Sequence, residues 1–130
     1  MEITITYEEV SNIIKTKSNV NATFTMIDSE SISVKVKPGL LIPAVNITLK
    51  LEKDAKEYKI RYGSGFVSLL VTKIVNLFVN DKLPEFVRLD TSNNTLSFDS
   101  TIKHNGIVVD IKDITFLEEK ISISLFLKDL

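Results

Sequence analysis

The side chains that could do chemistry are few in this chain of 130 residues, and its single histidine is the first to consider. His104 lies in the stretch Lys103-His104-Asn105-Gly106, whose Asn-Gly pair is typical of a hairpin turn. A histidine in such a turn acts as a general base only if folding brings a serine or a carboxylate beside it. The chain has no Gly-x-Ser-x-Gly elbow to supply a nucleophile. We therefore predict no catalytic residue and no enzymatic activity.

Paired carboxylates are the next candidates, because two of them can share acid–base work or hold a metal ion. They occur as Asp110 with Asp113 and as Glu118 with Glu119. Asp110 stands between two apolar residues of an alternating run and is expected to point to water, and the glutamates fit a turn. The sequence contains no cysteine and no calcium-loop spacing. We expect no metal and no cofactor.

A third candidate is the stretch Arg61-Tyr62-Gly63-Ser64-Gly65, which precedes an apolar segment. Backbone amides at a helix N-terminus, with an arginine nearby, can hold a phosphate or carboxylate. Arg61, Gly63, Ser64 and Gly65 are therefore predicted to hold the head group of a bound lipid, if there is one. The same residues are also explained as a flexible strand-to-helix turn that Ser64 or Gly65 caps.

The most apolar window of the chain is GFVSLLVTKIVNLFVNDKLP, from Gly65 to Pro84. Its polar residues recur every four positions at Ser68, Thr72, Asn76 and Asn80 and would form a thin stripe on a helix over 66–80. Such a helix is about 22 Å long, shorter than the roughly 30 Å hydrocarbon core of a bilayer. We interpret it as a core helix.

The rest of the chain alternates with a period of two, apart from one short segment near its start. Thr6-Tyr7-Glu8-Glu9 fits a capping box, and a helix over about 7–17 is predicted to follow it. The alternating runs predict strands with one apolar face: Phe24 and Met26; Ile32, Val34 and Val36; Val45, Ile47, Leu49 and Leu51; Tyr58, Ile60 and Tyr62; Leu96 and Phe98; Ile107, Val109 and Ile111; Ile121, Ile123, Leu125 and Leu127. Turns are expected around Asp28 to Ser31, at Asn93-Asn94 and at Asn105-Gly106.

One-sided strands need an apolar cover for their inner face. The predicted fold class is therefore α+β: a strongly curved antiparallel sheet of about eight strands wraps the apolar helix over 66–80, with the short helix over 7–17 at an edge. Residues 1–130 are expected to form a single domain, since this length can bury a core without metal or disulfide.

The net charge and the distribution of basic residues indicate which classes of partner to expect. A net charge of −1 argues against nucleic acid as a partner. The first residues, MEITITYEEV, have neither the basic start nor the apolar run of an export signal, so a cytoplasmic location is expected. A local excess of basic residues, which includes Lys35, Lys37, Lys50 and Lys59, is explained either by a solvated sheet surface or by weak contact with an anionic membrane.

The second half of the chain resembles a known family. The segments LPEFVRLDTSNNTLSFDS (Leu83 to Ser100) and GIVVDIKDITFLEEKISISLFL (Gly106 to Leu127) resemble an uncharacterised bacterial family of the Firmicutes, a domain of unknown function related to the tubular lipid-binding domains. Domains of that class wrap a long helix in a curved sheet and bind lipids. The resemblance implies that an apolar ligand lies in a groove lined by Leu69, Leu70, Ile74, Phe78, Leu83 and Phe86.

Two functions from different classes therefore remain open. The first is the binding of a lipid or other apolar small molecule in that groove. The second is a protein-interaction or assembly module, in which the same side chains form a fully packed core and a partner, such as a second copy in a homo-oligomer, docks on an exposed sheet edge.

Overall fold

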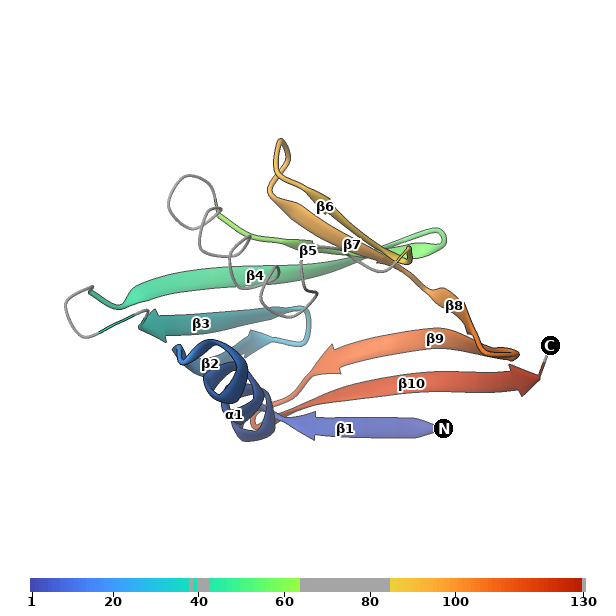
Figure 1. Ribbon diagram of the computed structural model, residues 1–130, viewed down its shortest axis with the longest axis horizontal. Helices are drawn as coiled ribbons and strands as arrows, with labels where there is room; N and C mark the ends of the chain where they lie inside the picture. Colours follow the sequence, from blue (N-terminus) through green and yellow to red (C-terminus); the bar gives the residue numbers. More distant parts are fainter. Residues whose placement is uncertain (38, 40–42, 64–84, 130) are drawn as a thin grey trace.

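The computed structural model describes residues 1–37, 39, 43–63 and 85–129, and these residues form mainly β structure. In chain order the elements are β1 (Glu2–Thr6), α1 (Tyr7–Ser18), β2 (Asn21–Asp28), β3 (Ser31–Lys37), β4 (Val45–Asp54), β5 (Glu57–Arg61), β6 (Val87–Asp90), β7 (Thr95–Asp99), β8 (Thr101–His104), β9 (Ile107–Phe116) and β10 (Lys120–Asp129). Figure 1 shows the strands arranged in two groups, with α1 beside β2.

The two groups are separate antiparallel sheets. One has four strands in the order β1-β10-β9-β8, and the other has six in the order β2-β3-β4-β5-β7-β6. The predicted α+β class, with one curved sheet wrapping a central helix, is therefore wrong: the described residues are mostly β, in two sheets, and α1 is their single helix. The helix predicted over 66–80 lies outside the described residues.

The single sheet that the sequence predicts is divided in two at a corner, where the chain passes from β7 to β8. Ser100 separates β7 from β8, and there the chain leaves the six-stranded sheet and enters the four-stranded one. The Ser100 N–H donates to the Lys56 carbonyl (2.9 Å), and the Ser100 carbonyl accepts from the Ile111 N–H (2.7 Å). Apolar alternation is the same on both sides of such a corner, so the sequence pattern does not show that the sheet changes.

The sheets also meet at a second place, and one core joins them. The Phe116 N–H, at the end of β9, donates to the Ser29 carbonyl in the β2–β3 turn (3.0 Å). The buried core cluster combines residues of α1 and the six-stranded sheet with Ile111 and Phe116 of β9. Tyr58 and Val36 are its largest fully buried side chains. The inner faces of both sheets are therefore apolar and face a shared interior.

The short helix near the start is confirmed, with one more residue than expected. Thr6 caps α1: its Oγ1 accepts from the Glu9 N–H (3.1 Å), and Glu9 Oε1 accepts from the Thr6 N–H (3.3 Å). This is the capping box that the sequence predicts. Asn19 ends the helix in the left-handed conformation with φ of 58°. Residues 2–6, for which no strand is predicted, form β1 along β10.

Removing the cap gives a first testable expectation. The change Thr6→Ala leaves the Glu9 N–H without its acceptor, so we expect the free energy of unfolding to fall by about 1 kcal/mol. Thr48→Ala is the control, because Thr48 is an exposed threonine on β4 and caps nothing. Urea denaturation of both variants measures the difference. An equal loss in both would contradict the capping role.

The predicted turns are also confirmed. Asn94 adopts a left-handed conformation between β6 and β7, and Asn105 and Gly106 have φ of 48° and 78° between β8 and β9. Positive φ at two successive positions is what a two-residue hairpin turn of type I′ requires, and Asn-Gly is a pair that this turn favours.

Within the described part of the chain, no helix is long and apolar enough to cross a membrane.

Candidate functional site

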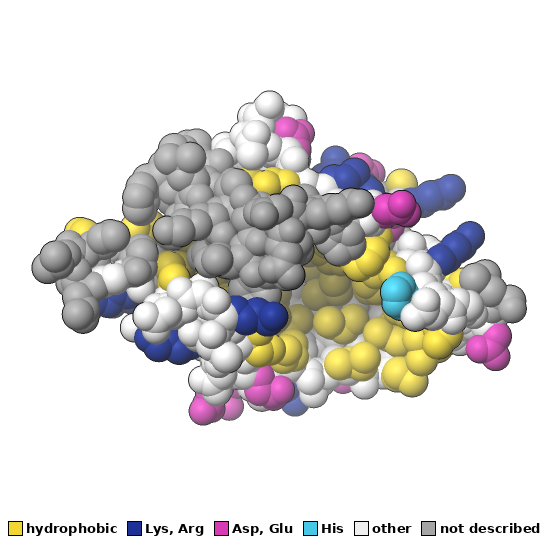
Figure 2. All heavy atoms as spheres, in the orientation of Figure 1, with side chains coloured by type: hydrophobic (Ala, Val, Ile, Leu, Met, Phe, Trp, Pro, Cys, Tyr) yellow, Lys and Arg dark blue, Asp and Glu magenta, His cyan; other side chains and the backbone are white. Residues whose placement is uncertain are grey.

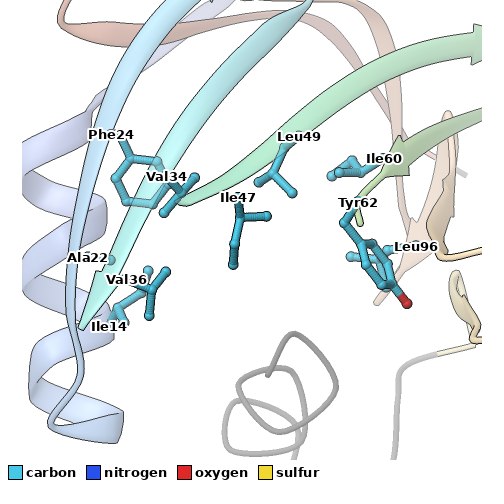
Figure 3. A pocket seen from close by; sticks show the side chains of 10 residues that line it. All are labelled: Ile14, Ala22, Phe24, Val34, Val36, Ile47, Leu49, Ile60, Tyr62 and Leu96. Atoms are coloured by element: carbon cyan, nitrogen blue, oxygen red, sulfur yellow. The ribbon is translucent and has the colours of Figure 1, made fainter. Parts of the chain in front are cut away.

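A wholly apolar cavity lies against the inner face of the six-stranded sheet, and we call it the sheet–helix cavity. Its volume is about 190 Å³. Figure 3 shows its side chains converging from β2, β3, β4 and the end of β5, from β7 and from α1. The described residues that line it are Ile14, Ala22, Phe24, Val34, Val36, Ile47, Leu49, Ile60, Tyr62 and Leu96.

The strand registers explain why these side chains meet. Phe24 stands opposite Val34, and Val34 stands opposite Ile47, so one row of apolar side chains crosses β2, β3 and β4. A second row crosses β5 and β7, where Ile60 stands opposite Leu96. Successive residues of a strand point to opposite faces, so these rows leave threonines, asparagines and charged residues on the outer face.

Helix α1 closes one side of the sheet–helix cavity with Ile14. Its first residue, Tyr7, is buried, stacks on Phe24 with ring centroids 6.0 Å apart, and donates its hydroxyl proton to the Leu117 carbonyl. Tyr7 thereby fixes the helix between the end of β9 and the face of β2. Ile13, the neighbour of Ile14 on this helix, is 44% exposed and does not contribute to the lining.

The chemistry that this cavity can perform is limited by its lining. Tyr62 supplies the single polar side-chain atom among the described lining residues, and the other lining side chains are hydrocarbon. Apart from the Tyr62 hydroxyl, no acid, base or nucleophile lines it within the described residues. This described lining can shield an apolar molecule from water and supplies no carboxylate, imidazole or amine for proton transfer.

The residues predicted to bind a head group are only partly described. Arg61 lies on the outer face of β5, and its Nε is 2.9 Å from Glu52 Oε2, so the cation is already paired. Tyr62, the next residue, has its side chain on the cavity side. The Arg61 guanidinium is therefore not brought to the sheet–helix cavity. Gly63 is exposed, and Ser64 and Gly65 lie outside the described residues.

The residues predicted to line a groove fall almost entirely outside the described residues: Leu69, Leu70, Ile74, Phe78 and Leu83. Phe86 is described. It is half-buried in the turn before β6, and its carbonyl accepts from the Asp99 N–H (3.0 Å). The described lining of the cavity is a different set of residues, and all of them except Leu96 come from the first half of the chain. Their signal is present in the sequence as the inner faces of the predicted strands, which the predicted fold turns toward the apolar helix over 66–80.

The predicted lysine surface is the outer face of the six-stranded sheet. Lys35 and Lys37 on β3 and Lys50 on β4 point away from the core, and within the described residues none of the three forms an ion pair. Lys59 on β5 is paired with Asp54 (3.5 Å) and Glu57 (3.6 Å). The membrane contact predicted for these lysines stays a prediction.

The side chains singled out for chemistry are not brought together. His104 is exposed in its hairpin turn, and its Nε2 lies 3.1 Å from the side-chain nitrogen Nδ2 of Asn105. Asp110 lies 2.9 Å from Lys112 Nζ, and this hydrogen-bonded cation lowers the pKa of the Asp110 carboxyl. Glu118 and Glu119 are exposed in the turn between β9 and β10. No group of three or more His, Cys, Asp or Glu side chains in the described ranges could hold a metal ion.

A second apolar surface lies on the four-stranded sheet. Figure 2 shows hydrophobic side chains gathered over β9, β10 and β1, at the lower right of the view. The register places Ile3, Ile107 and Leu127 on one face of this sheet, and they are 46%, 44% and 50% exposed. By the same register the buried residues Ile111, Phe116 and Leu125 lie on this face, so the exposed patch continues the apolar inner face of the four-stranded sheet. None of the three exposed residues lines the sheet–helix cavity.

Comparison with protein-family models, with curated proteins and with solved structures finds no match to this chain. The resemblance to tubular lipid-binding domains therefore stays an expectation, and the geometry described above carries the functional argument.

Proposed function

We propose that this protein binds an apolar ligand, a single alkyl chain or a small hydrocarbon-like molecule, in the sheet–helix cavity. One observation carries the proposal: a cavity of about 190 Å³ whose described lining is hydrocarbon except for the Tyr62 hydroxyl. Close packing is the rule in protein interiors, and voids larger than a water molecule are few. The described lining side chains present apolar surface to this space, so an apolar molecule bound there removes that surface from water, which is favourable.

The volume sets the size of the ligand. Apolar cavities of about 150 Å³ stay dry and accept molecules the size of benzene, whereas pockets for drug-sized ligands hold about 300–1,000 Å³. The sheet–helix cavity lies between these ranges. It suits one short alkyl chain or the end of a longer one, and it is too small to enclose a two-chain lipid.

The lining also sets how the ligand is oriented. A carboxylate or phosphate inside the cavity would lose its hydration without a compensating charge, which costs several kcal/mol. A polar head group therefore stays at the opening, in water, and the chain enters tail first. Affinity comes from burial, at about 0.8 kcal/mol for each methylene, so each added methylene should tighten binding about fourfold until the cavity is full.

A series of straight-chain carboxylic acids tests this proposal. The protein is loaded with a fluorescent fatty acid, and acids of increasing length are titrated against it. We expect affinity to rise about fourfold per methylene and then to level off once the chain outgrows the cavity. Native mass spectrometry with organic extraction shows whether a ligand already travels with the purified protein. No uptake of the probe, together with a clean ligand-free mass, would overturn the proposal and favour the packed interaction module.

A further inference from the structure

Strand β1 forms one edge of the four-stranded sheet, and its hydrogen bonds show which of its backbone groups are free to pair. Met1 exchanges two bonds with Leu125, and the Tyr7 N–H donates to the Glu119 carbonyl (3.0 Å). Bonded residues alternate along an antiparallel strand, so the odd-numbered residues of β1 bond to β10. The N–H and C=O groups of Glu2 and Thr4 therefore point away from the sheet, where the described chain places no other strand.

β1 is the least protected of the four edge strands against pairing with a further strand: it has five residues, and its one charge, Glu2, is at its end. Short length, charges and bulges are the usual protections. β6 and β8 have four residues each, with Arg88 on the first and Lys103 on the second. β2 has an irregularity between Met26 and Asp28 and packs against α1. β1 reads EITIT, with an unbroken register and neither lysine nor proline.

The sequence of β1 is also complementary to itself. In an antiparallel pair centred on Thr4, Thr4 faces its own copy, Ile3 faces Ile5, and Glu2 faces Thr6. No like charges stand opposite each other, and isoleucine pairs and threonine pairs are both favourable across strands. Because the Thr4 backbone groups point outward, this register makes the central pair a hydrogen-bonded one. The sheet's apolar face, where Ile3 is 46% exposed, would continue into the partner.

We propose that β1 pairs with β1 of a second copy of this chain about a two-fold axis at Thr4, which joins two four-stranded sheets into one continuous sheet. The contact is isologous, so the same residues serve both partners and the assembly closes as a dimer. It rests on one short strand and its neighbours, which is small for a protein interface, so the dimer dissociates on dilution. Neither partner's sheet–helix cavity is covered by this contact, since its lining belongs to the other sheet and α1.

Charge changes at Thr4 test the proposal. We expect the mass of the wild-type protein, from sedimentation equilibrium over a concentration series, to rise toward twice the monomer mass. Thr4→Lys and Thr4→Glu each place like charges directly opposite each other at the two-fold axis, and both should remain monomeric. An equimolar mixture of the two should associate again, because lysine then faces glutamate. Thr48→Lys, on the outer face of β4, is the control that should still dimerise.

Circular dichroism should be unchanged in all these variants, because Thr4 is exposed and its backbone does not bond to β10. Wild-type protein that stays monomeric up to its solubility limit would overturn the proposal. So would a wild-type dimer that Thr4→Lys leaves intact, since the dimer would then use another surface. A mixture that stays monomeric while both single variants are folded would contradict the β1–β1 register.

Discussion

Replacing Tyr58 with alanine is expected to lower the free energy of unfolding by about 3–5 kcal/mol, a large part of the stability of a domain this size. The Tyr58 side chain is 2% exposed and stacks on Phe98, with ring centroids 5.5 Å apart. Lys53 places its Nζ over the same ring and donates to the Lys112 carbonyl of β9 (3.1 Å). Tyr58 therefore packs where the two sheets meet, and its loss leaves a cavity there.

The matched variant Tyr58→Phe should behave in the opposite way. The Tyr58 hydroxyl is buried and has no hydrogen-bond partner among the described residues, and a buried unpaired hydroxyl costs about 1–3 kcal/mol. Removing it keeps the ring and should leave stability unchanged or raise it. Urea denaturation of the three proteins makes the comparison. A Tyr58→Phe variant as unstable as Tyr58→Ala would contradict this account of the interior.

Tyr58 also predicts how stability changes at high pH. Burial, and then the nearby Asp113 and Asp110 carboxylates, raise the pKa of Tyr58 above its ordinary value of 10.0. The folded protein thus keeps this proton when the unfolded chain has begun to lose it. Stability is fully present below the unfolded pKa and falls as pH rises toward the folded pKa. Tyr58→Phe should show a smaller fall than the wild type; an equal fall would mean that Tyr58 does not titrate with folding.

The second large effect is expected on ligand binding. Leu49 lies in the middle of the lining of the sheet–helix cavity (Figure 3), so Leu49→Trp places an indole in the space that the ligand would occupy. We expect the affinity for the fluorescent fatty acid to fall at least about tenfold, which corresponds to 1.4 kcal/mol. Because the cavity supplies room, the free energy of unfolding should change by less than the about 1–3 kcal/mol that overpacking a filled core costs.

The control for this variant is one residue away. Thr48→Trp adds the same side chain to the same strand but on its exposed outer face. It should bind the fatty acid as the wild type does. If Leu49→Trp instead destabilises the protein by the full cost of overpacking and wild-type binding is absent, the interior is packed. If both variants lose binding equally, the probe binds somewhere else.

The sequence predicts local structure well here because the signals are local. The capping box at Thr6 and Glu9, the Asn105-Gly106 turn and the apolar alternation of most strands all depend on residues close together in the chain. The sequence analysis predicts no strand over residues 2–6, although β1 alternates isoleucine with threonine. It is short and runs straight into α1, and its partner β10 is at the other end of the chain.

Sheet membership and the cavity could not be predicted, because both depend on contacts between distant residues. The Ser100 corner is held by Lys56 and Ile111, which the sequence pattern does not bring together. The lining of the sheet–helix cavity was predicted as the inner face of strands, yet the same alternation describes a filled core and a hollow one. The folded positions of all the lining residues are needed to show that a space lies between them.

The most direct test of the central claim is a nuclear magnetic resonance titration of methyl-labelled protein with octanoate. Binding in the sheet–helix cavity predicts saturable shifts of the Ile47, Leu49 and Leu96 methyl groups, and contacts from them to the octanoate chain. The Ile107 and Leu127 methyls, exposed on the other sheet, should not move. Shifts confined to Ile107 and Leu127, or no saturable shift at all, would contradict the claim that the cavity is a binding site.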